Sequence, residues 1–337
     1  MKIELRSDTF TKPSPEMMQA MFLAEVGDDV FEDDPSVNAL EMKAAAMFGY
    51  EKGLFCASGT MTNQIAINVH VKQGDEVICD AYSHIYVYEG GGISANSLAS
   101  VNLLHGNRGR VTAQQVREAV QPDNLHHPIS ALVSLENTVN KGGGVYYKLS
   151  EIQKIKAVCV EKNIPLHLDG ARIFNALAET KESPLAYGSA FDSMSICLSK
   201  GLGTPVGSVL LGTSDFIKKA RRVRKRFGGG WRQAGFLAAA GIFALDNNVN
   251  RLTEDHARAR EIGKIMAQRP EVEEVFDVDT NIVIFRLNDK ILSTDYIRNL
   301  NEKGITAVSF GKHLVRFVTH LDFTDEHLGA FRELILH

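Results

Sequence analysis

Two charged residues near the middle of the chain each follow a short apolar segment of the kind that forms a buried strand. Asp169 follows the segment 166–168, and Lys200 comes just after the segment 194–198. In open α/β sheets, ligands bind just beyond the carboxyl ends of the strands. The sequence therefore predicts one site that holds both the carboxylate and the amine.

A lysine and a carboxylate in one site are the pair required by pyridoxal 5'-phosphate. This cofactor needs an amine for its Schiff base and an acid that keeps its pyridine nitrogen protonated. The amine must be neutral to attack the aldehyde, and desolvation or nearby cations lower its pKa toward that state. Arg172 and the glycines of 199–207 fit such a setting. Alone, the Asp and the Lys are each more typical of a helix cap and a solvated charge.

A small-residue turn at 57–63, Ala-Ser-Gly-Thr-Met-Thr-Asn, precedes a helix that we predict over 64–71. Backbone N–H groups and the positive dipole end at a helix N-terminus favour a bound anion. Alone, this turn equally fits an ordinary helix start, but beside Asp169 and Lys200 it predicts a phosphate site.

His84 follows the predicted strand 76–80 and could stack on a cofactor ring or transfer a proton. A purely structural histidine is the commoner alternative.

The segments 167–175, His-Leu-Asp-Gly-Ala-Arg-Ile-Phe-Asn, and 199–207, Ser-Lys-Gly-Leu-Gly-Thr-Pro-Val-Gly, resemble the threonine aldolases. The resemblance covers nearly the whole chain and includes the segments 5–9, 26–30, 134–138 and 315–322. The resembled enzymes use pyridoxal phosphate, have the aspartate-aminotransferase fold (fold type I) and include low-specificity and allo-threonine-preferring forms. The resemblance implies a lyase of threonine catabolism that cleaves L-threonine or L-allo-threonine to glycine and acetaldehyde.

The resemblance also implies roles for individual residues around the cofactor. Lys200 would form the Schiff base, Asp169 would contact the pyridine nitrogen and His84 would stack on the ring. Gly59 and Thr60 would hold the phosphate. The remaining cofactor ligands implied are Arg172 and, from a neighbouring subunit, Arg232.

The same resemblance implies that Ser7, Arg172 and Arg316 bind the substrate carboxylate. It places His126 near the β-hydroxyl group, so His84 and His126 are both candidates for the base, directly or through water. Phe31 stands where family members usually carry Tyr, which removes a hydroxyl group near the expected substrate pocket.

Strands that alternate with helices predict an α/β fold with a mostly parallel central sheet flanked by helices. We expect an N-terminal arm at 1–34, a large cofactor-binding α/β domain at 35–246 and a small α+β domain at 247–337. By resemblance, we expect a homo-oligomer, specifically a homotetramer, with active sites at the dimer interface.

Composition narrows the remaining choices. The chain has 337 residues, is 44% hydrophobic and carries a net charge of −4, so we expect no nucleic-acid partner. Its 4 cysteines are scattered, no apolar run is long enough to span a bilayer and no signal peptide is visible, which together indicate the cytoplasm and no membrane. Neither the acidic run 28–34 nor the pair His126-His127 completes a metal-ligand set, so we predict no metal site.

Two alternatives remain open. Another fold type I reaction on an amino acid, β-elimination or transamination, would use the same Asp169 and Lys200. The basic segment 217–227 alone could indicate an RNA-associated module, but it has no interleaved aromatic residues, and a solvated helix face is the preferred interpretation.

Overall fold

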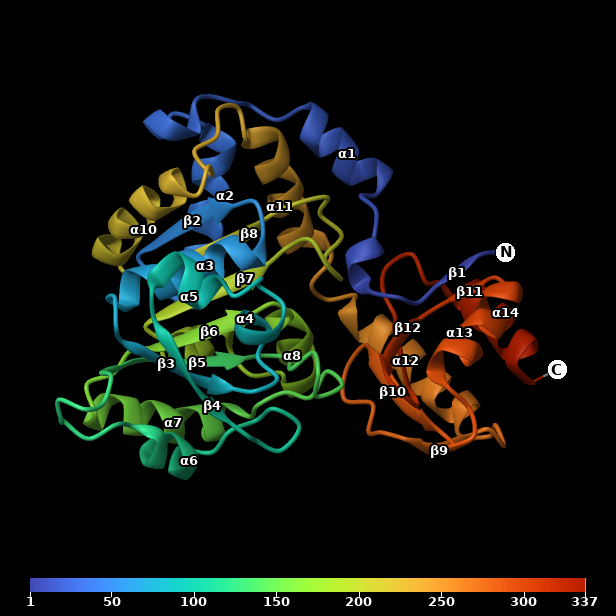
Figure 1. The fold of residues 1–337 in the computed structure, drawn as a ribbon. Coiled ribbons are helices and arrows are strands. Elements are labelled where there is room, and N and C mark those ends of the chain that lie inside the picture. Colours follow the sequence, from blue (N-terminus) through green and yellow to red (C-terminus); the bar gives the residue numbers. More distant parts are fainter. Residues whose placement is uncertain (337) are drawn as a thin grey trace.

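The computed structural model describes residues 1–336, and its largest sheet has seven strands in the order β2-β8-β7-β6-β5-β3-β4 (Figure 1). In chain order these strands are β2 (Lys52–Cys56), β3 (Glu76–Asp80), β4 (Ser100–Leu104), β5 (Ser130–Glu136), β6 (Leu166–Gly170), β7 (Ser193–Cys197) and β8 (Ser208–Gly212). Only β8 runs antiparallel to its neighbours, β2 and β7. The expected α/β fold with a mostly parallel sheet is therefore confirmed.

Both faces of this sheet are covered by helices, and successive residues of one strand point to opposite faces. Leu54 of β2 packs on the side of α3 and α10, whereas its neighbour Phe55 packs on the side of α2 and α11. Burial on both faces explains why these strands read as apolar runs. The helices of this part are α2 (Pro35–Phe48), α3 (Gly59–His70), α4 (His84–Val87), α5 (Gly92–Ser97), α6 (Ala113–Ala119), α7 (Leu149–Glu161), α8 (Ile173–Thr180), α9 (Pro184–Gly188), α10 (Ser214–Arg226) and α11 (Gly235–Asn247).

The C-terminal part has its own antiparallel sheet, in the order β12-β13-β10-β9, and its own apolar core around Phe285, Phe317 and Phe331. Its strands are β9 (Val272–Val275), β10 (Ile282–Leu287), β12 (Val308–Gly311) and β13 (Leu314–Val318). Its helices are α12 (Leu252–Met266), α13 (Ser293–Glu302) and α14 (Asp325–Leu336). The two sheets lie side by side in Figure 1.

The N-terminal arm contacts both parts. Its strand β1 (Ile3–Glu4) pairs in parallel with β11 (Ile305–Thr306), and Ile3 belongs to the C-terminal core. Its helix α1 (Pro15–Phe22) packs against α11, where buried Met17 joins the core of the large sheet. The arm therefore holds the segment around Asp8 against both parts of the molecule.

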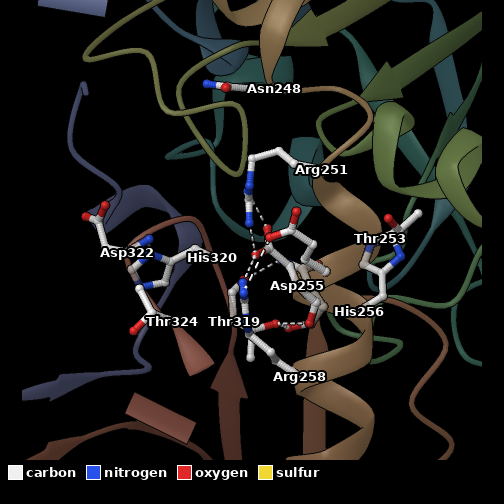
Figure 2. Close-up of polar contacts among 12 residues, drawn as sticks. Asn248, Arg251, Thr253, Asp255, His256, Arg258, Thr319, His320, Asp322 and Thr324 are labelled. Atoms are coloured by element: carbon white, nitrogen blue, oxygen red, sulfur yellow. Dashed lines mark hydrogen bonds and ion pairs between the residues drawn. The ribbon is translucent and has the colours of Figure 1, made fainter. Parts of the chain in front are cut away.

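A polar cluster joins the start of α12 to the end of β13 (Figure 2). Arg251 and Arg258 both form ion pairs with buried Asp255, and the Thr319 hydroxyl donates to the Asp255 carbonyl at 2.6 Å (Figure 2). The Thr319 carbonyl in turn accepts a hydrogen bond from the Asn281 side chain at 3.0 Å. The cluster thus fixes Asn281, which reaches the N-terminal arm.

Most predicted elements lie within a few residues of their positions in the structure, but α3 starts earlier than the predicted 64. It begins at Gly59 because the Ser58 hydroxyl accepts a hydrogen bond from the Met61 N–H at 3.2 Å. Capping by serine outweighs the low helix propensity of the two residues that follow it. In the part of the chain that the structure describes, no helix is long and apolar enough to cross a membrane.

Candidate active site

The structure brings Asp169, Lys200 and His84 to the same edge of the large sheet. Asp169 lies near the end of β6, in register with Glu136 of β5 and Ser195 of β7. Lys200 lies in the glycine-containing turn that follows β7, and His84 opens α4 after β3. The strands concerned, β3, β6 and β7, belong to the parallel part of the sheet, with β5 between β3 and β6. Their carboxyl ends lie at one edge, so the arrangement is the one that the strand ends predict.

The Asp169 carboxylate is buried and fixed by two donors. Its Oδ2 accepts a hydrogen bond from the Asn63 side chain at 2.9 Å, and its Oδ1 accepts one from the Ala171 N–H at 3.1 Å. Asn63 lies on α3, which packs across the sheet next to β6. Helix and strand together therefore orient this carboxylate.

A second buried carboxylate, Glu89, connects His84 to this arrangement. Glu89 Oε1 contacts His84 Nδ1 at 2.9 Å and accepts from Asn63 Nδ2 at 3.0 Å, while Oε2 accepts from Gln64 at 2.6 Å. Burial lowers the pKa of His84, but the hydrogen bond to Glu89 and the charge of Asp169 outweigh it, so that the pKa is raised. We did not predict Glu89 from the sequence, because nothing local marks it as buried.

Ligand-type atoms of His84, Glu89 and Asp169 all lie within 4.8 Å of one another. Such a group has the composition of a metal site. Hydrogen bonds already account for its compactness, since Asn63 donates to both carboxylates and His84 is hydrogen-bonded to Glu89.

Glu136, at the end of β5, supports the backbone around the site. Its two carboxylate oxygens accept hydrogen bonds from the N–H groups of His84, at 2.8 Å, and Asn140, at 2.9 Å. Burial, followed by the charge of Asp169, raises the pKa of Glu136 to about 7. Glu136 thus positions the first residue of α4 and, through Asn140, the loop that holds Arg316.

Arg172 and Asp8 form a buried ion pair beside the site. Arg172 Nε lies 2.7 Å from Asp8 Oδ2, and Arg172 Nη2 lies 2.8 Å from Asp8 Oδ1. Burial alone would raise the pKa of Asp8, but the charge and hydrogen bonds of Arg172 lower it well below its usual range. Asn281 adds a further hydrogen bond to Asp8 at 3.2 Å. Asp8 is a site residue that the sequence did not single out.

Arg316 approaches the same region from β13 of the C-terminal sheet. Its guanidinium donates to Asn140 Oδ1 at 2.8 Å and to the Arg6 carbonyl at 3.1 Å, and it lies over the Phe310 ring. Its Nε is buried and has no hydrogen-bond partner among the described residues. Burial and the positive charge of Arg172 lower the pKa of Arg316 to about 10. A bound anion would give Nε a hydrogen-bond acceptor and would offset the positive charge of the two arginines.

The predicted phosphate-binding residues Gly59 and Thr60 form the first turn of α3, capped by Ser58. Their N–H groups belong to the helix end that lacks intrahelical partners. Ser208 Oγ lies near this turn, since a Cβ added at Gly59 would be 3.7 Å from it. Ser208 Oγ and Thr204 Oγ1 are buried and have no partner among residues 1–336. The cradle therefore offers free donors to an anion.

Four of the residues singled out from the sequence lie elsewhere or have other contacts in a single chain. His126 lies on an exposed loop before β5, at the end of that strand opposite Glu136. Arg232 is exposed and paired with Asp28 at 2.9 Å, and Phe31 is 72% exposed. Ser7 caps the short 3-10 turn Asp8–Phe10 through its hydroxyl, next to the Asp8–Arg172 pair.

The basic segment forms α10, and its apolar side, including Phe216, Ile217 and Ala220, packs into the molecule. Arg224 is buried against Asp29 at 2.6 Å and the Phe55 carbonyl at 2.6 Å, while Lys218, Lys219 and Arg222 face solvent. Part of this charge is therefore structural, and the rest forms the solvated helix face preferred above.

The fold and this edge of the sheet define an α/β protein with a buried carboxylate and a lysine at adjacent strand ends. The sequence of residues 4–290 matches the model of the beta-eliminating lyase family. The chain is 40% identical to the low-specificity L-threonine aldolase of Escherichia coli (strain K12), over 97% of this chain and 96% of that protein. It is 39% identical to a probable low-specificity L-threonine aldolase of Arabidopsis thaliana, over 99% and 97%.

The chain therefore belongs to the beta-eliminating lyase family, among the relatives of the low-specificity L-threonine aldolases. A solved threonine aldolase from Leishmania major superposes with a TM-score of 0.85 at 20% identity and covers 99% of this chain and 98% of that one. At that identity the likeness shows the fold, which agrees with the family assignment.

Proposed function

We propose that this protein is a pyridoxal phosphate-dependent aldehyde-lyase that cleaves L-threonine and L-allo-threonine to glycine and acetaldehyde. The observation that carries the proposal is the meeting of Lys200, Asp169 and His84 at one sheet edge, beside a pair of buried arginines. The family and the relatives reported above support the same reaction.

The residues present fit the cofactor. Asp169 offers a fixed buried carboxylate for the pyridine nitrogen, Lys200 offers an amine, and Gly59 and Thr60 offer backbone N–H groups for the phosphate. The unpartnered Ser208 hydroxyl at the same helix start supports an anion there. When bound, pyridoxal phosphate would supply an electron sink for the carbanion that is left when the Cα–Cβ bond breaks.

Arg316 would hold the substrate carboxylate. Its buried Nε has no hydrogen-bond partner and its pKa is lowered, as expected of a guanidinium that is not paired with a carboxylate. Arginine binds carboxylates bidentately, which fixes the direction of the bonds at Cα. Arg172, already paired with Asp8, would contribute charge to this clamp, and Ser7 lies beside that pair.

Within a single chain, His84 is our candidate for the residue that moves a proton. Its Nδ1 is engaged by Glu89, which leaves Nε2 as the ring nitrogen available to a substrate hydroxyl or a water molecule. Ionised Glu89 would stabilise the positive charge that the ring gains when it accepts the proton. His126, on an exposed loop at the opposite end of β5, would have to approach such a site from a second copy of the chain.

We further propose that the active form is a homotetramer, in which a neighbouring subunit supplies Arg232 and His126. Both residues are exposed in a single chain, as are the apolar side chains of Phe22, Leu23 and Phe31 on the arm. Light scattering of the purified protein tests the assembly.

The four cysteines are buried free thiols, which supports a reducing compartment such as the cytoplasm.

β-Elimination is the second candidate, because the matching family model bears that name. It would use the same lysine and carboxylate but release ammonia and a keto acid instead of glycine and an aldehyde. Product analysis separates the two reactions directly.

Replacement of Lys200 by Ala tests the proposed chemistry. We expect the variant to lose the visible absorbance of bound cofactor and all cleavage of threonine, because no other amine follows β7 at this position. Lys148→Ala, on the surface at the start of α7, is the matched control and should retain both. Full activity of Lys200→Ala would refute the proposal.

A further inference from the structure

A chain of hydrogen bonds runs between helix α3 and the sheet face that it covers, from His70 to Asp169. His70 Nε2 lies 2.8 Å from Ser193 Oγ, and the same oxygen lies 2.8 Å from His167 Nδ1. His167 Nε2 lies 3.3 Å from Asn63 Oδ1, and Asn63 Nδ2 lies 2.9 Å from Asp169 Oδ2. Three side chains, those of Ser193, His167 and Asn63, thus connect half-buried His70 to the carboxylate of the proposed cofactor site.

The regular geometry of helix and strand produces this alignment. His70 and Asn63 are seven residues apart on α3, which puts them on the same face of the helix. His167 and Asp169 are two residues apart on β6, so they point to the same face of the sheet, and Ser193 is the partner of His167 in β7. The two polar residues of the helix, His70 and Asn63, therefore face three polar residues of the sheet: Ser193, His167 and Asp169.

Asn63 fixes the direction of the chain. Its Nδ2 group lies against two carboxylates, those of Glu89 at 3.0 Å and Asp169 at 2.9 Å, and a carboxylate oxygen can only accept. The amide must therefore present both N–H bonds to them and its oxygen to His167. Because that oxygen accepts, His167 Nε2 must carry hydrogen.

The remaining hydrogens follow from neutral histidines. Burial lowers the pKa of His167 to about 3 and that of His70 to about 4, so both rings are neutral at pH 7. Neutral His167 with hydrogen on Nε2 has a free lone pair on Nδ1, so the Ser193 hydroxyl must donate to it. Ser193 Oγ then accepts from His70 Nε2. Every donor in the chain points toward Asp169.

We propose that His70, Ser193, His167 and Asn63 form a one-directional hydrogen-bond relay that positions the Asp169 carboxylate and stabilises its negative charge. Hydrogen bonds in such a series polarise one another, and each donor favours negative charge at the end of the series. These four are positioning residues, since they act on a cofactor only through Asp169. The benefit to cofactor binding rests on the proposed function, but the relay itself does not.

The proton positions can be measured on the wild-type full chain. Long-range ¹H–¹⁵N correlation spectra of histidine-labelled protein at pH 7 should show His167 as a neutral ring with hydrogen on Nε2, and the His167→Gln variant identifies its signals. A protonated ring, or hydrogen on Nδ1, would overturn the relay whether or not the protein is an aldolase.

Two serines on β7 make a matched pair for a second experiment. Ser193→Ala removes the central link, whereas Ser195→Ala removes an equally buried hydroxyl that bonds Thr62 outside the relay. We expect Ser193→Ala to weaken pyridoxal phosphate binding about fivefold, the weight of one lost hydrogen bond, and to lose the fixed His167 tautomer. Ser195→Ala should keep that tautomer.

Equal effects of the two serine variants on cofactor affinity and on the His167 ring would contradict the relay. Absence of pyridoxal phosphate binding by the wild-type chain would instead refute the proposed function, and the His167 spectrum would still decide the relay.

Discussion

Asp8 and Arg172 are both buried and are joined by two hydrogen bonds, of 2.7 and 2.8 Å. Asp8 belongs to the N-terminal arm, and Arg172 is the residue that precedes α8. The pair connects segments 164 residues apart in the sequence. It therefore fixes the arm beside Asp169, Lys200 and Arg316, and it holds one of the two arginines of the proposed carboxylate clamp.

Replacement of Asp8 by Ala should destabilise the protein strongly. The change leaves the buried Arg172 charge without its partner, which typically costs about 3–5 kcal/mol in the free energy of unfolding. Glu161→Ala, which breaks the exposed pair with Arg117, should change the free energy of unfolding little, because water and salt screen such a pair. Urea unfolding monitored by circular dichroism measures both values, and equal losses would contradict the structural role of the buried pair.

The contribution of Asp8 should also depend on pH. Because its pKa is lower in the folded than in the unfolded protein, its stabilisation is present above the unfolded pKa of about 4 and is lost as the pH falls through the folded pKa. The difference in unfolding free energy between wild type and Asp8→Ala should therefore be constant near neutrality and shrink below about pH 4. A difference that grows in acid would exclude this explanation.

Replacement of Arg316 by Ala should mainly weaken substrate binding. Loss of a charged hydrogen-bonding partner for the carboxylate corresponds to a roughly tenfold to hundredfold rise in KM for threonine. Arg286→Ala is the control, because Arg286 lies on the adjacent strand β10 and only approaches Glu274 at 3.8 Å. Steady-state kinetics distinguish the two variants, and an unchanged KM in Arg316→Ala would argue against the clamp.

Replacement of Glu89 by Gln should lower the pKa of His84. The hydrogen bond and charge of Glu89 help to offset the effect of burial, so their loss leaves only the charges of Asp169 and Glu136 to oppose it. NMR titration of the His84 ring in the protein without cofactor measures the shift. Glu254→Gln, an exposed change on α12, is the control, and an unaltered His84 titration in Glu89→Gln would refute the pairing.

The same pair predicts a pH dependence of stability with the opposite sign to that of Asp8. The pKa of His84 is raised in the folded protein, so its stabilisation is complete below the unfolded pKa of about 6.5 and is lost as the pH rises through the folded value. Wild type should therefore exceed Glu89→Gln in unfolding free energy most clearly below about pH 6.5. A wild-type advantage confined to alkaline pH would contradict this.

Strand ends explain how much of the site could be predicted from the sequence. Asp169, Lys200 and His84 each follow a buried apolar segment, and parallel strands bring their carboxyl ends to one edge, so local pattern was sufficient. Glu89 and Asp8 could not be found in this way. Asp8 lies in a short polar segment and Glu89 lies between an aromatic-rich segment and three glycines, and neither pattern indicates a buried carboxylate. Only distant partners, Arg172 for Asp8 and Asn63 for Glu89, reveal their place in the site.

The limits of sequence patterns also differ between the two parts of the fold. The large sheet is predictable because its strands are buried on both faces and form apolar runs. The residues of β12 are all at least partly exposed and its register against β13 breaks, so no such run marks that strand. His126 and Arg232 were named by resemblance alone. Their exposure in one chain means that their proposed roles depend on contacts between copies, which the pattern of a single sequence does not encode.

Arg232→Ala tests that dependence. If a neighbouring subunit supplies Arg232 to the phosphate, the variant should bind pyridoxal phosphate roughly tenfold more weakly. Its stability should stay close to that of wild type, since the exposed pair with Asp28 contributes little. Equilibrium titration of the cofactor gives the affinity. Replacement of Arg222, an exposed arginine on α10, is the control, and equal affinities of both variants would place Arg232 outside the site.

The most direct test of the proposed function is the release of acetaldehyde from L-threonine and from L-allo-threonine, measured in parallel with pyridoxal phosphate present. We predict release from at least one substrate with an equimolar amount of glycine, and the ratio of the two rates gives the selectivity at the β-carbon. Absence of acetaldehyde from both, in a protein that binds the cofactor through Lys200, would contradict retro-aldol cleavage.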